Sequence, residues 1–188
     1  MIIGLTGSLA AGKEVVSDFF KEKGFIYFSL SNEVREVAKK RGIELTRKNL
    51  QDLGNELRET EGIGVLAKRV LNKIKENNNL NVIVDGVRNP AEIDVLKALN
   101  NFFLIAVDAP KEIRFDRFVK RNRESDPNTW EGFLKVDSRD KGEGESETGQ
   151  GVGKCMGRAD FTLDNSGTLE EIQNKVERLY LNLLKSNN

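Results

Sequence analysis

The feature that most constrains the fold is a glycine loop close to the first residue. Residues 7–13 read GSLAAGK and follow the apolar run at residues 2–6. Apolar residues at helical spacing come next, so we expect a helix over residues 13–23. A strand, a GxxxxGK loop and a helix in this order surround phosphate with backbone N–H groups at a helix N-terminus. The sequence therefore predicts a phosphate-binding loop.

Apolar runs and helical patterns then alternate along the rest of the chain. We expect strands at residues 25–29, 81–85, 102–108 and 161–163, and helices at 32–41, at 47–77 with a break near Gly62 and Gly64, after Pro90, after Pro110, and at 168–184. Strands that alternate with helices form a parallel sheet. We predict one α/β domain over residues 1–188 with the three-layer P-loop NTPase fold, a parallel sheet flanked by helices.

The composition excludes several classes of function. Lys plus Arg and Asp plus Glu number 30 each, so no overall basic field attracts nucleic acid or acidic membranes. There is no His and only one Cys, Cys155, which excludes an internal disulfide and the usual imidazole base. The apolar start is short and lacks a basic region before it. We expect a cytoplasmic monomer or homodimer whose chemistry depends on positioning and charge.

The residue after the loop lysine departs from the usual motif. That position normally carries a Ser or Thr that binds Mg²⁺, and here it is Glu14. A carboxylate can hold the ion directly or through water, but its charge also opposes a polyphosphate. Two interpretations stay open, a working variant and a non-catalytic ATP sensor with a degenerate loop. The residues predicted to bind ATP are Gly7, Ser8, Leu9, Ala10, Ala11, Gly12, Lys13, Glu14, Val15 and Arg117.

Two further elements supply candidate ligand-binding side chains. Asp85 and Arg88 follow the strand expected at residues 81–85, at the sheet edge where α/β proteins bind ligands. Asp85 is predicted to hold Mg²⁺ together with Glu14, and Arg88 to bind an acceptor phosphate. Arg35 is a second candidate for that phosphate. The alternatives are a turn in which Asp85 caps the next helix, and a solvent-facing Arg35.

Basic residues gather between positions 114 and 123. We predict that Arg117 stacks on adenine and that Arg121 stabilises charge on the transferred phosphoryl group. The alternative is that part of this group only faces water; its members are Arg114, Arg117, Lys120, Arg121 and Arg123. Residues 164–168 (DNSGT) are predicted to be mainly a structural turn before the last helix.

Residues 137–154 form a charged, glycine-rich segment with almost no large apolar side chains. Such a composition predicts that the segment contributes nothing to the core. It is interpreted either as a disordered surface loop or as part of a mobile lid over residues 122–158 that orders over bound nucleotides.

The order of these motifs resembles the adenylate kinase-like nucleoside monophosphate kinase superfamily over nearly the whole chain. Residues 85–88 (DGVR) are similar to its DGFPR element with one residue missing. The resemblance implies that Arg35 and Arg88 bind the acceptor phosphate, that Arg117 stacks on adenine and that Arg121 binds phosphate. It also implies an acceptor-binding helical region over about residues 30–78.

Two branches of that superfamily are the most similar. Glu14 and residues 50–58 (LQDLGNELR) resemble phage-type deoxynucleoside monophosphate kinases, although those carry a hydroxyl residue where this chain has Val15. Residues 159–172 resemble dephospho-coenzyme A kinases. Those kinases carry an acidic element after the second strand, where this chain has FSLSN at residues 28–32. Loss of that acid, the expected base for a hydroxyl, favours a phosphate acceptor.

The sequence thus predicts an ATP-dependent kinase that transfers the γ-phosphoryl group to a nucleoside or deoxynucleoside monophosphate. The alternatives are dephospho-coenzyme A kinase and the ATP sensor. Mg²⁺ is the expected cofactor, ATP the co-substrate and a small phosphorylated molecule the acceptor. The catalytic candidates are Lys13, Arg88 and Arg121, and the acceptor-binding candidates are Arg35, Arg58, Asp85 and Arg88.

Overall fold

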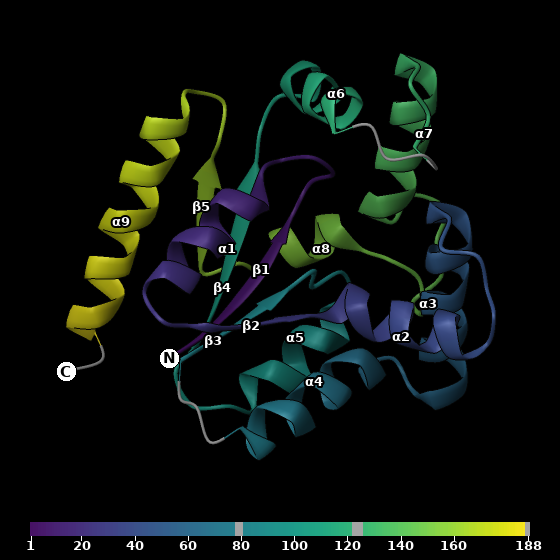
Figure 1. Ribbon diagram of the computed structural model, residues 1–188, viewed down its shortest axis with the longest axis horizontal. Helices are drawn as coiled ribbons and strands as arrows, with labels where there is room; N and C mark the ends of the chain where they lie inside the picture. Colours follow the sequence, from purple (N-terminus) through teal and green to yellow (C-terminus); the bar gives the residue numbers. More distant parts are fainter. Residues whose placement is uncertain (78–80, 122–125, 187–188) are drawn as a thin grey trace.

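A five-stranded parallel sheet forms the centre of the molecule (Figure 1). The computed structural model describes residues 1–77, 81–121 and 126–186. The strands lie in the order β2-β3-β1-β4-β5. Their bounds are β1 (Ile2–Gly7), β2 (Ile26–Ser29), β3 (Val82–Asp85), β4 (Phe102–Asp108) and β5 (Phe161–Asp164). The predicted α/β P-loop fold is therefore confirmed.

The nine helices of the described residues pack around this sheet. They are α1 (Lys13–Glu22), α2 (Leu30–Lys40), α3 (Arg47–Glu61), α4 (Val65–Glu76), α5 (Pro90–Lys97), α6 (Lys111–Lys120), α7 (Trp130–Lys141), α8 (Val152–Met156) and α9 (Leu169–Ser186). The predicted break between α3 and α4 is present, with Gly62 at a φ of 103°. No helix within the described ranges is long and apolar enough to span a membrane.

Strand β1 is buried on both faces, which explains its unbroken apolar sequence. It pairs with β3 from Ile2 opposite Val82 and with β4 as far as Gly7 opposite Val107. Its successive side chains enter different cores, because neighbouring side chains of a strand point to opposite faces. The glycine loop therefore starts at the middle of the sheet, between the ends of its neighbours.

Two helical layers cover the two faces of the sheet (Figure 1). On one face, α1 and α9 bury side chains such as Phe20 and Val176 against Ile3 and Leu5. On the other face, α2, α3, α4, α5 and α8 pack against Ile2 and the strands beside it. Helices α6 and α7 lie at the end of the sheet where β1 stops, away from both termini (Figure 1).

The predicted exposure of residues 137–154 is wrong. The segment contains the end of α7 and most of α8, and Asp137, Asp140, Gln150 and Val152 are buried. Composition was misleading here because buried carboxylates need charged partners rather than apolar neighbours. Asp137 pairs with Arg114, and Asp140 pairs with Arg88. The lid itself stays a prediction, and its residues 122–125, Arg123 included, lie outside the described residues, as does residue 78 of the expected acceptor region.

Asp85 does not cap the helix that follows it. The cap of α5 is Asn89, whose side chain accepts from the Ala91 N–H at 2.9 Å. The Glu92 side chain in turn accepts from the Asn89 N–H at 3.1 Å, which completes a capping box. The Asp85 carboxylate therefore takes no part in the cap of α5.

Candidate functional site

The loop between β1 and α1 has a backbone that requires glycine at two positions. Gly7 has a φ of 140°, and a Cβ there would lie 2.1 Å from the Val107 carbonyl oxygen. Gly12 has a φ of 88°, and a Cβ there would lie 2.3 Å from Asn165 Nδ2. Ala10 also adopts a left-handed conformation, with a φ of 58°. With this backbone the loop curls tightly just before the N-terminus of α1, as a phosphate-binding loop requires.

Lys13 folds back over the loop that it ends. Its ammonium donates to the carbonyl oxygens of Gly7 at 2.8 Å and Ser8 at 3.1 Å. Burial lowers the pKa of Lys13, while the negative charges of Asp85 and Asp140 act in the opposite direction. The positive charge is thus held at a poorly hydrated point between the loop and two carboxylates.

A single cleft of about 1170 Å³ opens beside this lysine. Residues after β1, β2 and β3 line it, so it lies at the carboxyl edge of the sheet. Gly7 and Ser8, although predicted to bind ATP, are not part of its lining, and Ser8 is buried. The predicted side chains that line it are Lys13, Glu14, Arg35, Arg58, Asp85, Arg88, Arg117 and Arg121.

Asp85 presents one carboxylate oxygen that lacks a partner. Tyr27 on β2 donates its hydroxyl to Asp85 Oδ2 at 2.7 Å. Burial and the Asp85 charge raise the pKa of Tyr27, so Tyr27 remains a hydrogen-bond donor at neutral pH. Asp85 Oδ1 is buried and has no hydrogen-bond partner among the described residues. A buried acceptor of this kind is costly unless a ligand completes it, so Asp85 Oδ1 is a candidate ligand atom.

Arg88 is held from both its backbone and its side chain. Its N–H donates to Glu92 Oε2 at 2.8 Å, and its Nη1 donates to Asp140 Oδ1 at 3.1 Å. The Gln150 amide bridges the same pair, donating to Asp140 at 2.7 Å and accepting from Arg88 at 3.2 Å. Asp140 is a site residue that the sequence did not predict, because it lies in the segment interpreted as a loop.

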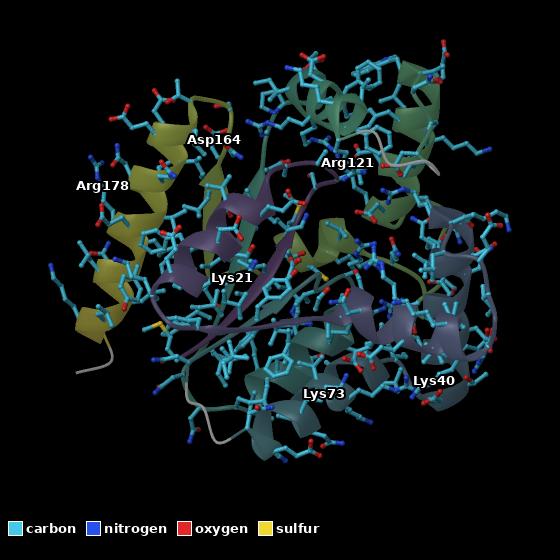
Figure 2. The ribbon with its side chains drawn as sticks, in the orientation of Figure 1. Lys21, Lys40, Lys73, Arg121, Asp164 and Arg178 are labelled. Carbon is cyan, nitrogen blue, oxygen red and sulfur yellow. The ribbon has the colours of Figure 1, made fainter. Side chains whose placement is uncertain are left out.

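Arg121 takes part in an ion bridge across the cleft. Asp126 accepts from Arg47 Nε at 2.6 Å and from Arg121 Nη2 at 2.7 Å. Both guanidinium groups also lie against the Phe118 ring. Figure 2 labels Arg121 at the end of α6, beside α7. The bridge joins the start of α3 to the end of α6, and its three residues line the cleft.

Arg117 also stabilises the glycine loop and the turn beside it through hydrogen bonds to two carbonyl groups. Its Nη1 donates to the Ala11 carbonyl at 3.3 Å and its Nη2 to the Asn165 carbonyl at 3.0 Å. Asn165 Nδ2 also donates to Ala11 at 2.8 Å. The turn at residues 164–168 therefore contacts the phosphate-binding loop through the Asn165 side chain, which the sequence did not predict.

Among the described basic residues between positions 114 and 121, Arg114 is the most deeply buried. It is 1% exposed and donates to the carbonyls of Ala109 at 2.9 Å and Leu9 at 3.0 Å. The same guanidinium forms a buried pair with Asp137 on α7. Lys120, in contrast, is exposed. Arg114 thus links α7 to the glycine loop. No sequence motif predicted this role.

The two remaining acceptor candidates differ in their surroundings. Arg35 on α2 is half-buried, and its Nη1 lies 3.5 Å from Asn32 Oδ1. Arg58 on α3 is 3% exposed and pairs with Glu92, which is fully buried. Both arginines line the cleft on the side of α2 and α3, opposite Arg117. The structure therefore brings the predicted donor and acceptor residues into one space.

Comparison with known proteins places the chain in a family. A family model described as an AAA domain matches residues 3–138. A UPF0200 protein from Hyperthermus butylicus is 37% identical over 179 residues, which make up 95% of this chain and 92% of that protein. A UPF0200 protein from Pyrococcus horikoshii is 33% identical over 192 residues, with 99% of each chain covered.

Solved structures of small-molecule kinases share the fold. Shikimate kinase from Aquifex aeolicus has a TM-score of 0.51 at 18% identity, over 100% of this chain and 98% of that chain. A gluconokinase from Sinorhizobium meliloti has a TM-score of 0.55 at 14% identity, over 99% and 97%. Identities this low establish the fold alone. The family match and the UPF0200 relatives show that the chain belongs to the UPF0200 family, and the solved structures show that it shares its fold with P-loop kinases.

Proposed function

We propose that the protein is an ATP-dependent phosphotransferase whose acceptor is a nucleoside or deoxynucleoside monophosphate. One observation supports this most strongly. A single cleft is lined by the loop lysine, Lys13, by Arg35 and Arg88, and by Asp85, and the charges of Asp85 and Arg88 act directly on Lys13. Two phosphate-binding sides that share one space are what in-line transfer between two phosphates requires.

The donor side would be formed by the glycine loop and the elements that brace it. Backbone N–H groups after Gly7 surround the β- and γ-phosphates, and Lys13 neutralises their outer charge. Arg117 lies beside the loop at Ala11 and Asn165, close to where the rest of ATP would extend. Arg121 would stabilise charge on the transferred group, a role that its planar guanidinium suits.

The carboxylates in the cleft fit a hard divalent cation. Asp85 Oδ1 is a buried oxygen without a partner among the described residues, and Glu14 adds a second carboxylate at the start of α1. Within the described part of the chain no group of three or more such side chains gathers. Mg²⁺ commonly takes only one or two carboxylates and completes its shell with water and substrate phosphates. When bound, Mg²⁺ would neutralise charge on those phosphates.

The acceptor side is rich in arginine. Arg35, Arg58 and Arg88 line this side of the cleft. Guanidinium groups bind phosphate in a forked geometry. A phosphate acceptor is already ionised at neutral pH, so it needs orientation rather than deprotonation. The Arg88 backbone and side chain are both fixed by hydrogen bonds, which gives that orientation a rigid base.

The test is an acceptor panel. The purified protein is incubated with Mg·ATP and each ribo- and deoxynucleoside monophosphate, and ADP and phosphorylated products are measured by mass spectrometry. We expect one class of monophosphate to yield a diphosphate in the wild type and none in Lys13→Met. Tight ATP binding with no phosphorylated product from any member of the panel would contradict the proposal.

A second candidate, dephospho-coenzyme A kinase, is favoured by Asp140. This carboxylate is 4% exposed, lines the cleft and lies near Lys13. It places an acid beside the acceptor side, where the segment at residues 28–32 lacks one. A hydroxyl acceptor needs such a base, whereas a phosphate acceptor does not. Dephospho-coenzyme A added to the same panel separates the two, because only the second candidate yields a phosphorylated product from this hydroxyl acceptor.

A further inference from the structure

Glu92 fixes two arginine-bearing segments of the acceptor side with one carboxylate. Its Oε1 accepts from Arg58 Nε at 3.0 Å and from Arg58 Nη2 at 2.8 Å. Its Oε2 accepts from the backbone N–H groups of Arg88 at 2.8 Å and Asn89 at 3.1 Å. Because Glu92 is fully buried, water cannot replace these four hydrogen bonds, and they hold its side chain in one position. Glu92 therefore sets how Arg58 and Arg88 stand relative to each other.

The pairing with Glu92 uses only one edge of the Arg58 guanidinium. The remaining nitrogen, Nη1, is buried and has no hydrogen-bond partner among the described residues. Arg58 is 3% exposed, yet it is part of the cleft lining. A buried, charged donor without a partner is costly in a folded protein, and such groups often mark the place of a ligand. An anion is the natural partner for this nitrogen.

Gly54 keeps the wall of the cleft beside that nitrogen free of a side chain. It lies inside α3, one helical turn before Arg58, and it also lines the cleft. A Cβ at this position would lie 3.5 Å from Arg58 Nη1 and 3.7 Å from Val34 Cγ2, which are ordinary van der Waals contacts. Alanine would therefore fit and would favour the helix, because glycine inside a helix is less stable than alanine. The structure of α3 does not require this glycine, whereas access to Arg58 does.

We propose that Arg58 Nη1, which lies next to Gly54 in the wall of the cleft, binds the phosphate of the phosphorylated acceptor, and that Glu92 is the positioning residue for this site. The inference rests on the proposed function, which supplies the phosphate-bearing acceptor. Glu92 holds the Arg88 backbone as well as the Arg58 guanidinium, so the two arginine-bearing segments keep a fixed relation at the phosphate site. The site selects acceptors that carry a phosphate monoester.

The first test uses Gly54→Ala. The full-length protein is saturated with Mg²⁺ and a non-hydrolysable ATP analogue, which fills the glycine loop, and inorganic phosphate is then titrated by calorimetry. We expect phosphate affinity to fall by about fivefold or more, since a charge-assisted hydrogen bond is obstructed, while Tm stays equal or rises. Thr60→Ala, a neutral change at an exposed position of the same helix, should keep wild-type affinity. Unchanged affinity in Gly54→Ala would overturn the proposal.

The second test uses Glu92→Gln, which keeps the size of the side chain and removes its charge. Arg58 loses its charged partner, so we expect phosphate affinity to fall by about tenfold or more. Glu33→Gln is the matched control, because Glu33 is also a buried carboxylate, pairs with Lys73 and lies outside the cleft lining. The control should lose stability and keep its phosphate affinity. Equal losses of affinity in both variants would overturn the positioning role.

Binding of inorganic phosphate needs no turnover, so the two proposals fail separately. If phosphate binding depends on Gly54 and Glu92 but no acceptor is phosphorylated, the anion site stands and the kinase proposal fails. If an acceptor is phosphorylated and the affinity for inorganic phosphate does not depend on Gly54 or Glu92, the kinase proposal stands and the acceptor binds elsewhere.

Discussion

At the scale of single residues, the central group is Lys13. Its ammonium is desolvated, which lowers its pKa, and Asp85 and Asp140 counter that effect. Two carbonyls of its own loop hold it in place. A charge held this way is already oriented before a polyphosphate arrives, so it needs little rearrangement during transfer. Because this position is buried, a lysine on the surface could not place its charge there.

Replacing Lys13 by Met should therefore abolish most of the activity without unfolding the protein. We expect kcat to fall by about 10²–10³-fold, the usual cost of losing one group that stabilises transition-state charge. Steady-state ADP release, coupled to a spectroscopic readout, measures it. Lys39→Met, at an exposed position of α2, serves as the control and should behave like the wild type. A Lys13→Met protein with normal kcat would contradict the assigned role.

Glu14 distinguishes a working kinase from a sensor. It lies in the first turn of α1 and lines the cleft. If it helps to hold Mg²⁺, Glu14→Ser should lower turnover and raise the Mg²⁺ concentration for half-maximal rate by severalfold, because a hydroxyl is a weaker cation ligand than a carboxylate. A Mg²⁺ titration of the initial rate measures both. Faster turnover in Glu14→Ser would instead support a degenerate site.

At the scale of elements, helix α7 is attached to the rest of the molecule mainly through charged and aromatic side chains. Asp137 forms a buried pair with Arg114, and Arg114 also holds the Leu9 carbonyl in the glycine loop. Phe133 packs against Phe118 on α6. Any displacement of α7 is therefore transmitted to the loop that would bind phosphate.

Asp137→Asn should be strongly destabilising. It breaks the buried pair of Arg114, a loss that typically costs about 3–5 kcal/mol, and leaves Asp108 Oδ1, 3.9 Å from Arg114 Nε, as a weaker partner. Urea unfolding followed by circular dichroism gives the change in free energy. Asp18→Asn, which breaks the exposed pair with Lys21, should change stability by less than about 1 kcal/mol. Similar small losses in both variants would show that the buried pair is not a main attachment of α7.

The Asp126 bridge between α3 and α6 predicts a pH dependence. Burial alone would raise the pKa of Asp126, but the hydrogen bonds and charges of Arg47 and Arg121 outweigh it, so the net pKa lies below its ordinary value. A carboxyl whose pKa is lowered in the folded state stabilises the fold at pH values above its unfolded pKa of about 3.9, and this contribution is lost as the pH falls through the folded pKa.

The wild-type protein should therefore have a larger free energy of unfolding than Asp126→Asn at neutral pH. Urea unfolding at several pH values checks that the difference shrinks below about pH 4; a constant difference would rule out the bridge as its cause.

The elements themselves were largely predictable from the sequence. Periodic apolar residues and glycine or proline signals located helices α1 to α6 and α9, including the break between α3 and α4. These signals are local, so they can be read along the chain. Helices α7 and α8 were missed because they bury few apolar side chains within a polar, glycine-rich segment, and because burial of Asp137 and Asp140 depends on partners far away in sequence.

At the scale of the whole molecule, the strand order decides which residues meet. With β1 between β3 and β4, the glycine loop lies beside Asp85 and Arg88 at one edge of the sheet. The motifs at strand ends could therefore be predicted to converge. Asp140, Asn165 and Glu92 could not, because their roles arise from contacts with Arg88, Ala11 and Arg58 that no local pattern encodes.

The most direct measurement follows the γ-phosphate itself. ATP radiolabelled at that phosphate is incubated with Mg²⁺, the protein and the monophosphate acceptors, and the label is divided by chromatography between inorganic phosphate and acceptor product. A phosphotransferase with this cleft should pass most of the label to one class of acceptor, and Lys13→Met should pass none. Label found only in inorganic phosphate, or left in ATP, would contradict transfer between two sides of one cleft.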